Sequence, residues 1–171
     1  MVTGQPVAAF ERKIVDPGQL GALEAAIAAA AHPLVFTNGV FDLLHRGHAT
    51  YLAQARTLGA ALLVALNSDA SVRRLGKGDD RPVNLLADRL AVVAALESVS
   101  LVTWFDADTP LGLIERCAPD VLVKGGDWPV ERIVGAEFVR ARGGSVHSIA
   151  FEHERSTTAM LHRIRATQPA T

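Results

Sequence analysis

Several residue types are scarce in this 171-residue sequence, and each scarcity excludes a class of protein. The single cysteine, Cys117, excludes an internal disulfide and a cysteine-rich metal site. Aromatic residues make up 5%, which leaves little material for the stacking surfaces that bind single-stranded nucleic acid. Neither charge sign is in excess, because 17 Lys and Arg face 18 Asp and Glu. A near-neutral chain is not a general polyanion binder, so we expect no nucleic-acid partner.

Long apolar runs are also missing. The alanine-rich stretch at residues 25–31 is too short to span a bilayer. Charged residues near the beginning, Glu11, Arg12, Lys13 and Asp16, come before any long apolar run, unlike in a signal peptide. We therefore expect no membrane partner and a cytoplasmic location.

The composition that is present suits one folded domain. Hydrophobic residues make up 49% of the chain and charged residues 20%, which is enough apolar material to bury a core. Residues 1–32 are expected to form an N-terminal extension with a helix that packs on the main domain at 33–171. That alanine-rich helix, opened by Asp16-Pro17-Gly18, could lie in the core or form a dimer contact, so a homo-oligomer is an open expectation.

Strand and helix patterns alternate along the main domain. Short apolar runs predict five strands, at residues 34–36, 62–66, 101–105, 121–123 and 146–149. Helical patterns lie between and after them, at residues 47–58, 85–96, 110–117, 130–141 and 156–165, and a charged, glycine-containing loop spans 67–82. Alternation of this kind predicts an α/β fold: a single Rossmann-like, doubly wound domain, with a five-stranded parallel sheet and helices on both faces. Ligands of such sheets bind at the carboxyl ends of the strands.

Residues 37–48 carry the strongest indication of chemistry. They run from a strand into a helix start, where backbone amides and the helix dipole favour a bound anion. Gly47 lets a phosphate approach the backbone, and His45 and His48 are three residues apart, on the same side of the first turn. Two imidazoles there can donate hydrogen bonds to a phosphoryl oxygen. A chance surface pair is the alternative. A zinc site is disfavoured, because the spacing is not four and no third ligand is obvious, so we expect no metal held by side chains.

Other nucleotide motifs are absent from the sequence. It has no G-x-x-x-x-G-K-[ST], which excludes a P-loop protein. No G-x-G-x-x-G follows the first strand, which argues against a nicotinamide-dependent oxidoreductase.

The segments G-V-F-D-L-L-H-R-G-H, K-G-G-D-W and S-T-T resemble the motifs of the cytidylyltransferase-like nucleotidyltransferases. Together with V-A-L-N-S-D-A-S, D-R-P-V-N and P-D-V-L-V-K-G-G-D, they most resemble the heptose-1-phosphate adenylyltransferase domains of ADP-heptose synthases. The resemblance runs from about residue 33 to 165, so it implies an HxGH nucleotidyltransferase domain at 33–171. Many such domains are fused behind a sugar kinase, which this sequence lacks, so the resemblance implies a stand-alone form that works with a separate heptose kinase.

The implied reaction joins AMP from ATP to D-glycero-β-D-manno-heptose 1-phosphate, giving ADP-heptose and pyrophosphate for lipopolysaccharide precursor synthesis. Mg²⁺ and local cations would offset the substrate charge. The alternatives are a glycerol-3-phosphate-type cytidylyltransferase and a non-catalytic nucleotide-binding module. Related cytidylyltransferases read R-T-E-G-I-S-T where this chain has H-E-R-S-T-T. That difference argues mildly against CTP, and no role is transferred to Arg155.

The resemblance also implies site residues. The catalytic set is His45, His48 and Lys77. The nucleotide-binding set is Thr37, Asn38, Gly39, Phe41, Gly47, Asn67, Arg89, Gly125, Gly126, Asp127, Ser156, Thr157 and Thr158. Arg73 and Arg81 are candidates for the substrate phosphate.

Several of these residues have a structural alternative. The loop that holds Lys77 is either a mobile basic flap or a solvated charged loop. Arg89 could instead form an ion pair on a helix surface, and Ser156 could only cap a helix. Asp42 orients a histidine or caps a helix end, and Trp128 packs on a neighbour or lies near the base.

Overall fold

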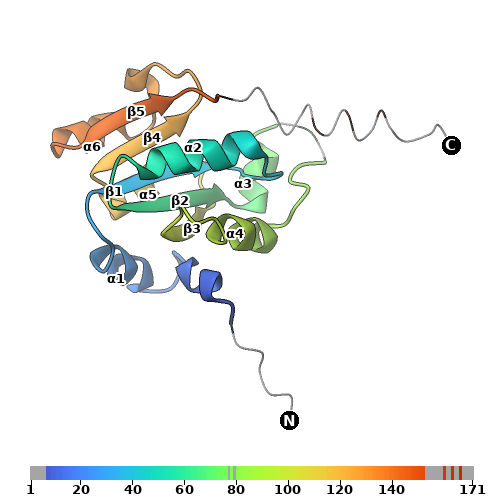
Figure 1. The fold of residues 1–171 in the computed structure, drawn as a ribbon, viewed down its shortest axis with the longest axis horizontal. Coiled ribbons are helices and arrows are strands. Elements are labelled where there is room, and N and C mark those ends of the chain that lie inside the picture. The colour runs from blue at the N-terminus through green and yellow to red at the C-terminus, as the bar shows by residue number, and fades with distance from the viewer. Residues whose placement is uncertain are drawn as a thin grey trace, which may run out of the picture.

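Five parallel strands form the centre of the structure. This computed structural model describes residues 7–76, 78, 80–152, 160, 163 and 166. The sheet order is β3-β2-β1-β4-β5, and every neighbouring pair is parallel (Figure 1). The predicted five-stranded parallel sheet is therefore confirmed. The strands are β1 (Leu34–Gly39), β2 (Ala61–Asn67), β3 (Leu101–Phe105), β4 (Val121–Gly125) and β5 (Ser145–Ile149).

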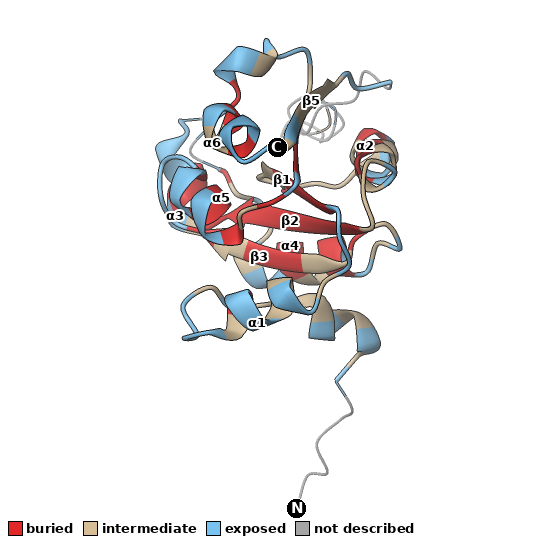
Figure 2. Ribbon diagram, turned by 90° about the vertical axis from the view of Figure 1, so that its left-hand side faces the viewer, coloured by how far each residue is buried: buried red, intermediate tan, exposed pale blue. Residues whose placement is uncertain are grey.

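Helices cover both faces of this sheet, as predicted (Figure 2). The helices α2 (Arg46–Arg56) and α4 (Leu86–Ala94) pack on one face, together with the 3-10 helix η1 (Ala9–Lys13). On the other face lie α1 (Ala22–Ala28), α5 (Leu111–Cys117) and α6 (Ala136–Ala141). All seven residues of β2 are buried, which explains why this strand reads as an unbroken apolar run.

The N-terminal segment is built into the domain. Ile14 forms a bridge with Val102 of the edge strand β3, and the Val15 amide donates to the Val102 carbonyl at 2.8 Å. Leu23 of α1 is fully buried in the second core. The alanine-rich helix therefore packs one face against the core and leaves the other exposed. It begins at Ala22, later than predicted, because the Asp16 carboxylate caps a turn at Gly18 instead of the helix.

Two other predicted elements are wrong in extent. Part of the predicted 67–82 loop is helical, as α3 (Asp69–Arg74), because the Ser68 hydroxyl accepts a hydrogen bond from the Ser71 amide. The predicted helix at 130–141 is divided into the 3-10 helix η2 (Val130–Arg132) and α6. Gly135 separates them with φ of +88°, a conformation that does not continue a helix. The helix predicted at 156–165 lies largely outside the described residues.

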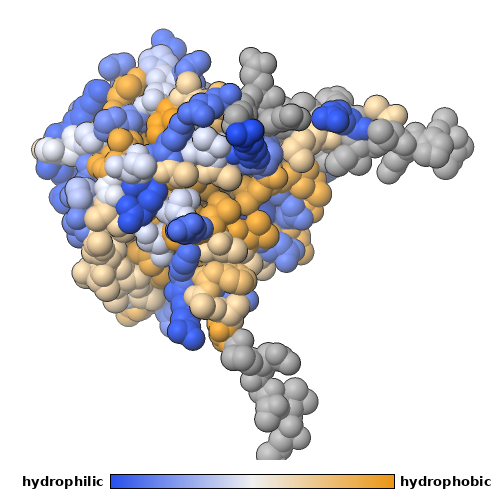
Figure 3. Space-filling view, in the orientation of Figure 1, coloured by the Kyte–Doolittle hydropathy of each residue, from blue (hydrophilic) through white to orange (hydrophobic). Residues whose placement is uncertain are grey.

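The surface is chemically mixed. Figure 3 shows hydrophilic residues over much of one face and a group of apolar residues between the positions of α2 and α4. Within the described part of the chain, no helix is long and apolar enough to cross a membrane.

Candidate active site

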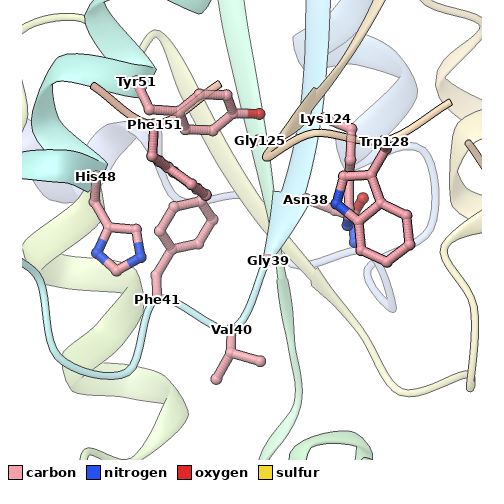
Figure 4. A pocket seen from close by; sticks show the side chains of 10 residues that line it. All are labelled: Asn38, Gly39, Val40, Phe41, His48, Tyr51, Lys124, Gly125, Trp128 and Phe151. Atoms are coloured by element: carbon pink, nitrogen blue, oxygen red, sulfur yellow. The ribbon is translucent and has the colours of Figure 1, made fainter. Parts of the chain in front are cut away.

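A pocket of about 260 Å³ opens where β1 and β4 end. The chain leaves β1 for β2 on one side and reaches β4 on the other, so this is the point where the strand order reverses. Ligands of open parallel sheets bind at such a switch point. The pocket is lined by Asn38, Gly39, Val40, Phe41, His48, Tyr51, Lys124, Gly125, Trp128 and Phe151 (Figure 4).

The two histidines of the motif meet at the start of α2. His45 is the residue before the helix and keeps an extended backbone, while His48 lies in the first turn. Their rings stack with centroids 3.9 Å apart and an angle of 23° between the planes. Gly47, between them in the chain, is buried. The spacing prediction is confirmed, since both imidazoles lie on one side of the turn.

His48 is held in its neutral form. Burial, followed by the charge of the neighbouring His45, lowers the pKa of His48 to about 4. Its Nδ1 atom is buried and has no hydrogen-bond partner among the described residues. A buried polar atom without a partner is costly, and the His48 ring that carries it also lines the pocket. This ring is therefore suited to hydrogen bonding with a phosphoryl group.

Aromatic rings surround His48 on the pocket wall (Figure 4). The Phe41 ring lies 5.4 Å from that of His48, and the Phe151 ring lies 6.4 Å away and perpendicular to it. Tyr51 contacts Phe151 in turn. A Cβ at Gly125 would come within 2.7 Å of the Phe151 ring, so a larger residue there would push this ring from its present position. The aromatic residues therefore make the surroundings of the imidazole apolar on this side of the pocket.

The opposite side of the pocket is more polar. Figure 4 shows Asn38, Lys124 and Trp128 gathered there, across the end of β1 from His48. Lys124 brings a positive charge into the lining. Trp128 is 52% exposed, so it does not serve the core alone.

Sequence reasoning missed four lining residues: Val40, Tyr51, Lys124 and Phe151. Two of them carried a usable signal. Tyr51 lies three residues after His48 on the same helix, and Lys124 ends an apolar strand.

Two predicted nucleotide-binding residues lie behind the pocket. Thr37 is fully buried, and its hydroxyl lies 2.5 Å from that of Tyr51. The Asn67 amide donates to the Ser71 hydroxyl at 3.0 Å. Neither side chain lines the pocket, because each is committed to a buried hydrogen bond, and that of Thr37 holds Tyr51, which is a lining residue.

Gly126 and Asp127 follow the lining residue Gly125. The amide of Gly126 donates to the carbonyl of Ile149 at 2.8 Å, and Asp127 is exposed. Nucleotide contact by these two residues stays a prediction.

The predicted arginines have three different environments. Arg73 is exposed at the end of α3. Arg81 is buried, with its Nε 2.6 Å from the Asp42 carboxylate. Arg89 is also buried, so the alternative of a surface ion pair is wrong. Neither Arg81 nor Arg89 lines the pocket, because their guanidinium groups are engaged by protein oxygens.

Asp42 links the motif to a distant segment. Its carboxylate accepts the amides of Val83 at 3.0 Å and Asn84 at 2.9 Å. It therefore caps the segment before α4 and contacts neither histidine through a described hydrogen bond. The predictions for Lys77, Ser156, Thr157 and Thr158 lie outside the described residues. Among the described residues, no three His, Cys, Asp or Glu side chains are grouped to hold a metal.

Residues 36–149 match the family model described as cytidylyltransferase-like. The chain belongs to this family of nucleotidyltransferases. It is 54% identical, over 158 residues, to the D-beta-D-heptose 1-phosphate adenylyltransferase of Bordetella bronchiseptica, covering 92% of this chain and 97% of that protein. It is also 54% identical to the bifunctional protein HldE of Hahella chejuensis over 82% of this chain, but it spans only 30% of that protein's length.

Solved structures share the fold. The lipopolysaccharide core biosynthesis protein from Thermoplasma volcanium superposes with a TM-score of 0.57 at 26% identity, covering 71% of this chain and 98% of that one. The pantoate-beta-alanine ligase from Francisella tularensis gives 0.55 at 10% identity, covering 85% of this chain and 69% of that one, which is a likeness of fold alone.

Proposed function

We propose that this enzyme transfers the AMP moiety of ATP to D-glycero-β-D-manno-heptose 1-phosphate, giving ADP-heptose and pyrophosphate for lipopolysaccharide precursor synthesis. The observation that carries the proposal is the 54% identity to a heptose 1-phosphate adenylyltransferase over almost the whole of both chains. The stacked imidazoles at the sheet's switch point support it, because they offer hydrogen bonds where a phosphoryl group would lie.

The proposed chemistry is one displacement at phosphorus. An oxygen of the sugar phosphate attacks the α-phosphorus of ATP and forms the new P–O bond. The bond between the α-phosphorus and the bridging oxygen breaks, and its electron pair leaves with pyrophosphate. In the transition state, negative charge grows on the oxygens of the α-phosphate and on the departing bridging oxygen. Preorganised hydrogen-bond donors aimed at these oxygens lower the barrier. We propose that His48 and His45 supply such donors and are catalytic residues.

Positive charge must offset the two substrates, which carry roughly six negative charges near neutral pH. Lys124 lines the pocket, and the helix α2 begins at its histidine wall, where the helix dipole favours a bound anion. We propose that the exposed Arg73, at the end of α3, and Lys77, which follows this helix in the sequence, add to this charge.

Mg²⁺ needs few protein ligands when phosphates and water supply the rest. The described residues offer no three-ligand site for it. A metal held by three such side chains therefore does not fit this part of the chain. We propose that any Mg²⁺ enters with the triphosphate.

The nucleotide is proposed to lie along the ends of β1 and β4, against Asn38, Gly39, Phe41 and Gly125, which line the pocket. The sugar phosphate must be made by an enzyme that phosphorylates heptose, and we propose a separate heptose kinase for that step. A cytoplasmic location belongs to the same proposal, because ATP is the donor.

A pyrophosphate-release assay over a panel of nucleotides and sugar phosphates tests the proposal. ATP with D-glycero-β-D-manno-heptose 1-phosphate should give the highest kcat/KM. CTP with glycerol 3-phosphate is the contrasting pair. Faster release from that pair would assign the enzyme to the other branch of the family. Nucleotide binding without release from any pair would make the chain a non-catalytic module.

A further inference from the structure

Arg89 is a buried cation outside the pocket. Its side chain is fully buried, and its guanidinium donates four hydrogen bonds within the protein. The Nε atom donates to the Asn84 carbonyl at 3.0 Å, and Nη2 donates to the Asp69 carboxylate at 2.7 Å. The Nη1 atom donates to the carbonyls of Val40 at 2.8 Å and Asn67 at 2.9 Å. A buried charge is tolerated when its donors are satisfied in this way.

The oxygens that accept from Arg89 belong to separate segments around the site. Val40 follows β1, Asn67 ends β2, Asp69 begins α3, and Asn84 lies before α4. The planar guanidinium of one arginine therefore connects the carboxyl ends of two strands to the beginnings of two helices by hydrogen bonds. Lysine cannot reproduce this geometry, because it lacks the planar array of donors.

The residue after Val40 is strained. Phe41 has φ of +49°, in the left-handed region that residues other than glycine rarely adopt. Strain of this kind persists where the surroundings fix the backbone on both sides. Here Arg89 holds the preceding carbonyl, and Asp42, the following residue, is held by the amides of Val83 and Asn84.

The strained turn aims the Phe41 ring at the catalytic histidines. The ring is buried and makes an edge contact with His48 at 5.4 Å. Gly39 leaves it room, because a Cβ there would lie 2.9 Å from the Phe41 ring. A continuous set of contacts therefore joins Arg89 to His48 through the Val40–Phe41 peptide.

We propose that Arg89 is a positioning residue for adenylyl transfer: by holding the Val40 carbonyl it fixes the Phe41 turn, which sets the orientation of His48. This inference rests on the proposed function and replaces the predicted contact of Arg89 with nucleotide. Direct contact would require the guanidinium to leave four buried hydrogen bonds.

The test compares Arg89→Lys with Arg116→Lys. Arg116 donates to Glu24 and to the Pro17 carbonyl, so it joins α5 to the N-terminal segment far from the pocket. For Arg89→Lys we expect kcat to fall roughly tenfold or more, as for a misplaced catalytic group, with the dissociation constant of ATP changed less than about twofold. Arg116→Lys should change neither quantity. An ATP affinity weakened as much as kcat, or an unchanged kcat, would overturn the proposal.

Nuclear magnetic resonance of histidine-labelled protein separates this inference from the proposed function. The His48 ring signals, assigned with His48→Gln, should shift in Arg89→Lys and not in Arg116→Lys, even if the enzyme prefers other substrates. Signals that stay in place in Arg89→Lys would refute the positioning role. If Arg89→Lys does not fold, Asp69→Ala, which removes one acceptor of Arg89, should shift the same signals and lower kcat. If Asp69→Ala changes neither the His48 signals nor kcat, the positioning role of Arg89 is refuted.

Discussion

Two pockets of similar size but different chemistry lie at the opposite ends of the parallel strands. We call the end where the strands finish the carboxyl edge and the end where they begin the amino edge. The carboxyl edge holds the pocket of about 260 Å³, and the amino edge holds one of about 230 Å³ beside Pro33, Asp120 and Arg142. Each edge has a histidine. His32 Nδ1 lies 2.6 Å from the Asp120 carboxylate, whereas His48 Nδ1 has no hydrogen-bond partner among the described residues. An imidazole paired with a carboxylate is already satisfied, and an enclosed one without a partner is available to a ligand.

The ionisable groups of the two edges also differ in their charge state. Burial would raise the pKa of Asp120, but hydrogen bonds from the Leu34 amide and from His32 outweigh it and lower that pKa. At the carboxyl edge, burial and the neighbouring His45 lower the pKa of His48. The amino edge therefore stabilises a carboxylate anion of its own, while the carboxyl edge has a neutral histidine on one side of the pocket and Lys124 on the other.

Removing the imidazole at the carboxyl edge should have the largest effect. His48→Ala is expected to lower kcat for pyrophosphate release by roughly 10²-fold or more, as for the loss of one transition-state donor. Its circular dichroism spectrum should match that of the wild type. Turnover close to normal in this variant would remove the functional distinction between the two edges.

Lys77, which follows α3 in the sequence, should give the next largest effect on kcat. Lys77→Ala is expected to lower kcat by roughly tenfold, with a smaller loss of ATP affinity, if the lysine acts chiefly on the transition state. Steady-state kinetics and a direct binding titration measure the two effects. Equal losses would point to general charge attraction, and Lys77 would then have no catalytic role.

The two edges should lose their contributions to folding stability over different pH ranges. The unfolded chain protonates His48 near pH 6.5, whereas the folded protein resists protonation until about pH 4. The stability from neutral His48 is therefore fully present above pH 6.5 and is lost as the pH falls toward 4. The contribution of Asp120 is present above its ordinary pKa of 3.8 and is lost only below it.

Urea unfolding at about pH 7 and about pH 4.5 checks this difference. The wild type should lose more stability over that interval than His48→Gln. Equal losses in the two proteins would contradict the assignment of a neutral, partly buried His48.

The amino edge should respond least. His32→Ala removes an exposed hydrogen bond to the Asp120 carboxylate, so we expect a loss below about 1 kcal/mol in unfolding free energy. Its kcat should match that of the wild type in the pyrophosphate assay. A large loss of activity would mean that the amino edge contributes to the site.

Much of the fold could be predicted, because buried parallel strands need continuous apolar runs such as that of β2. The predicted beginnings and ends of helices were wrong where a polar side chain or a glycine determines them. Ser68 begins α3 inside an apparently charged loop, and Gly135 divides the helix expected after β4.

The histidine pair of the site was also predictable, since its spacing alone places both rings on one turn. The surroundings of the pair were not. Phe151 reaches His48 only through the pairing of β5 with β4. Arg89 shows the same limit, because its partners are backbone carbonyls of other segments, which no local pattern reveals.

A crystal structure with an ATP analogue that carries a methylene group between the α- and β-phosphorus tests the central claim most directly. The α-phosphate should lie within hydrogen-bonding distance of the His45 and His48 rings, at the start of α2. A nucleotide bound elsewhere, with both imidazoles turned away from its phosphates, would contradict that claim.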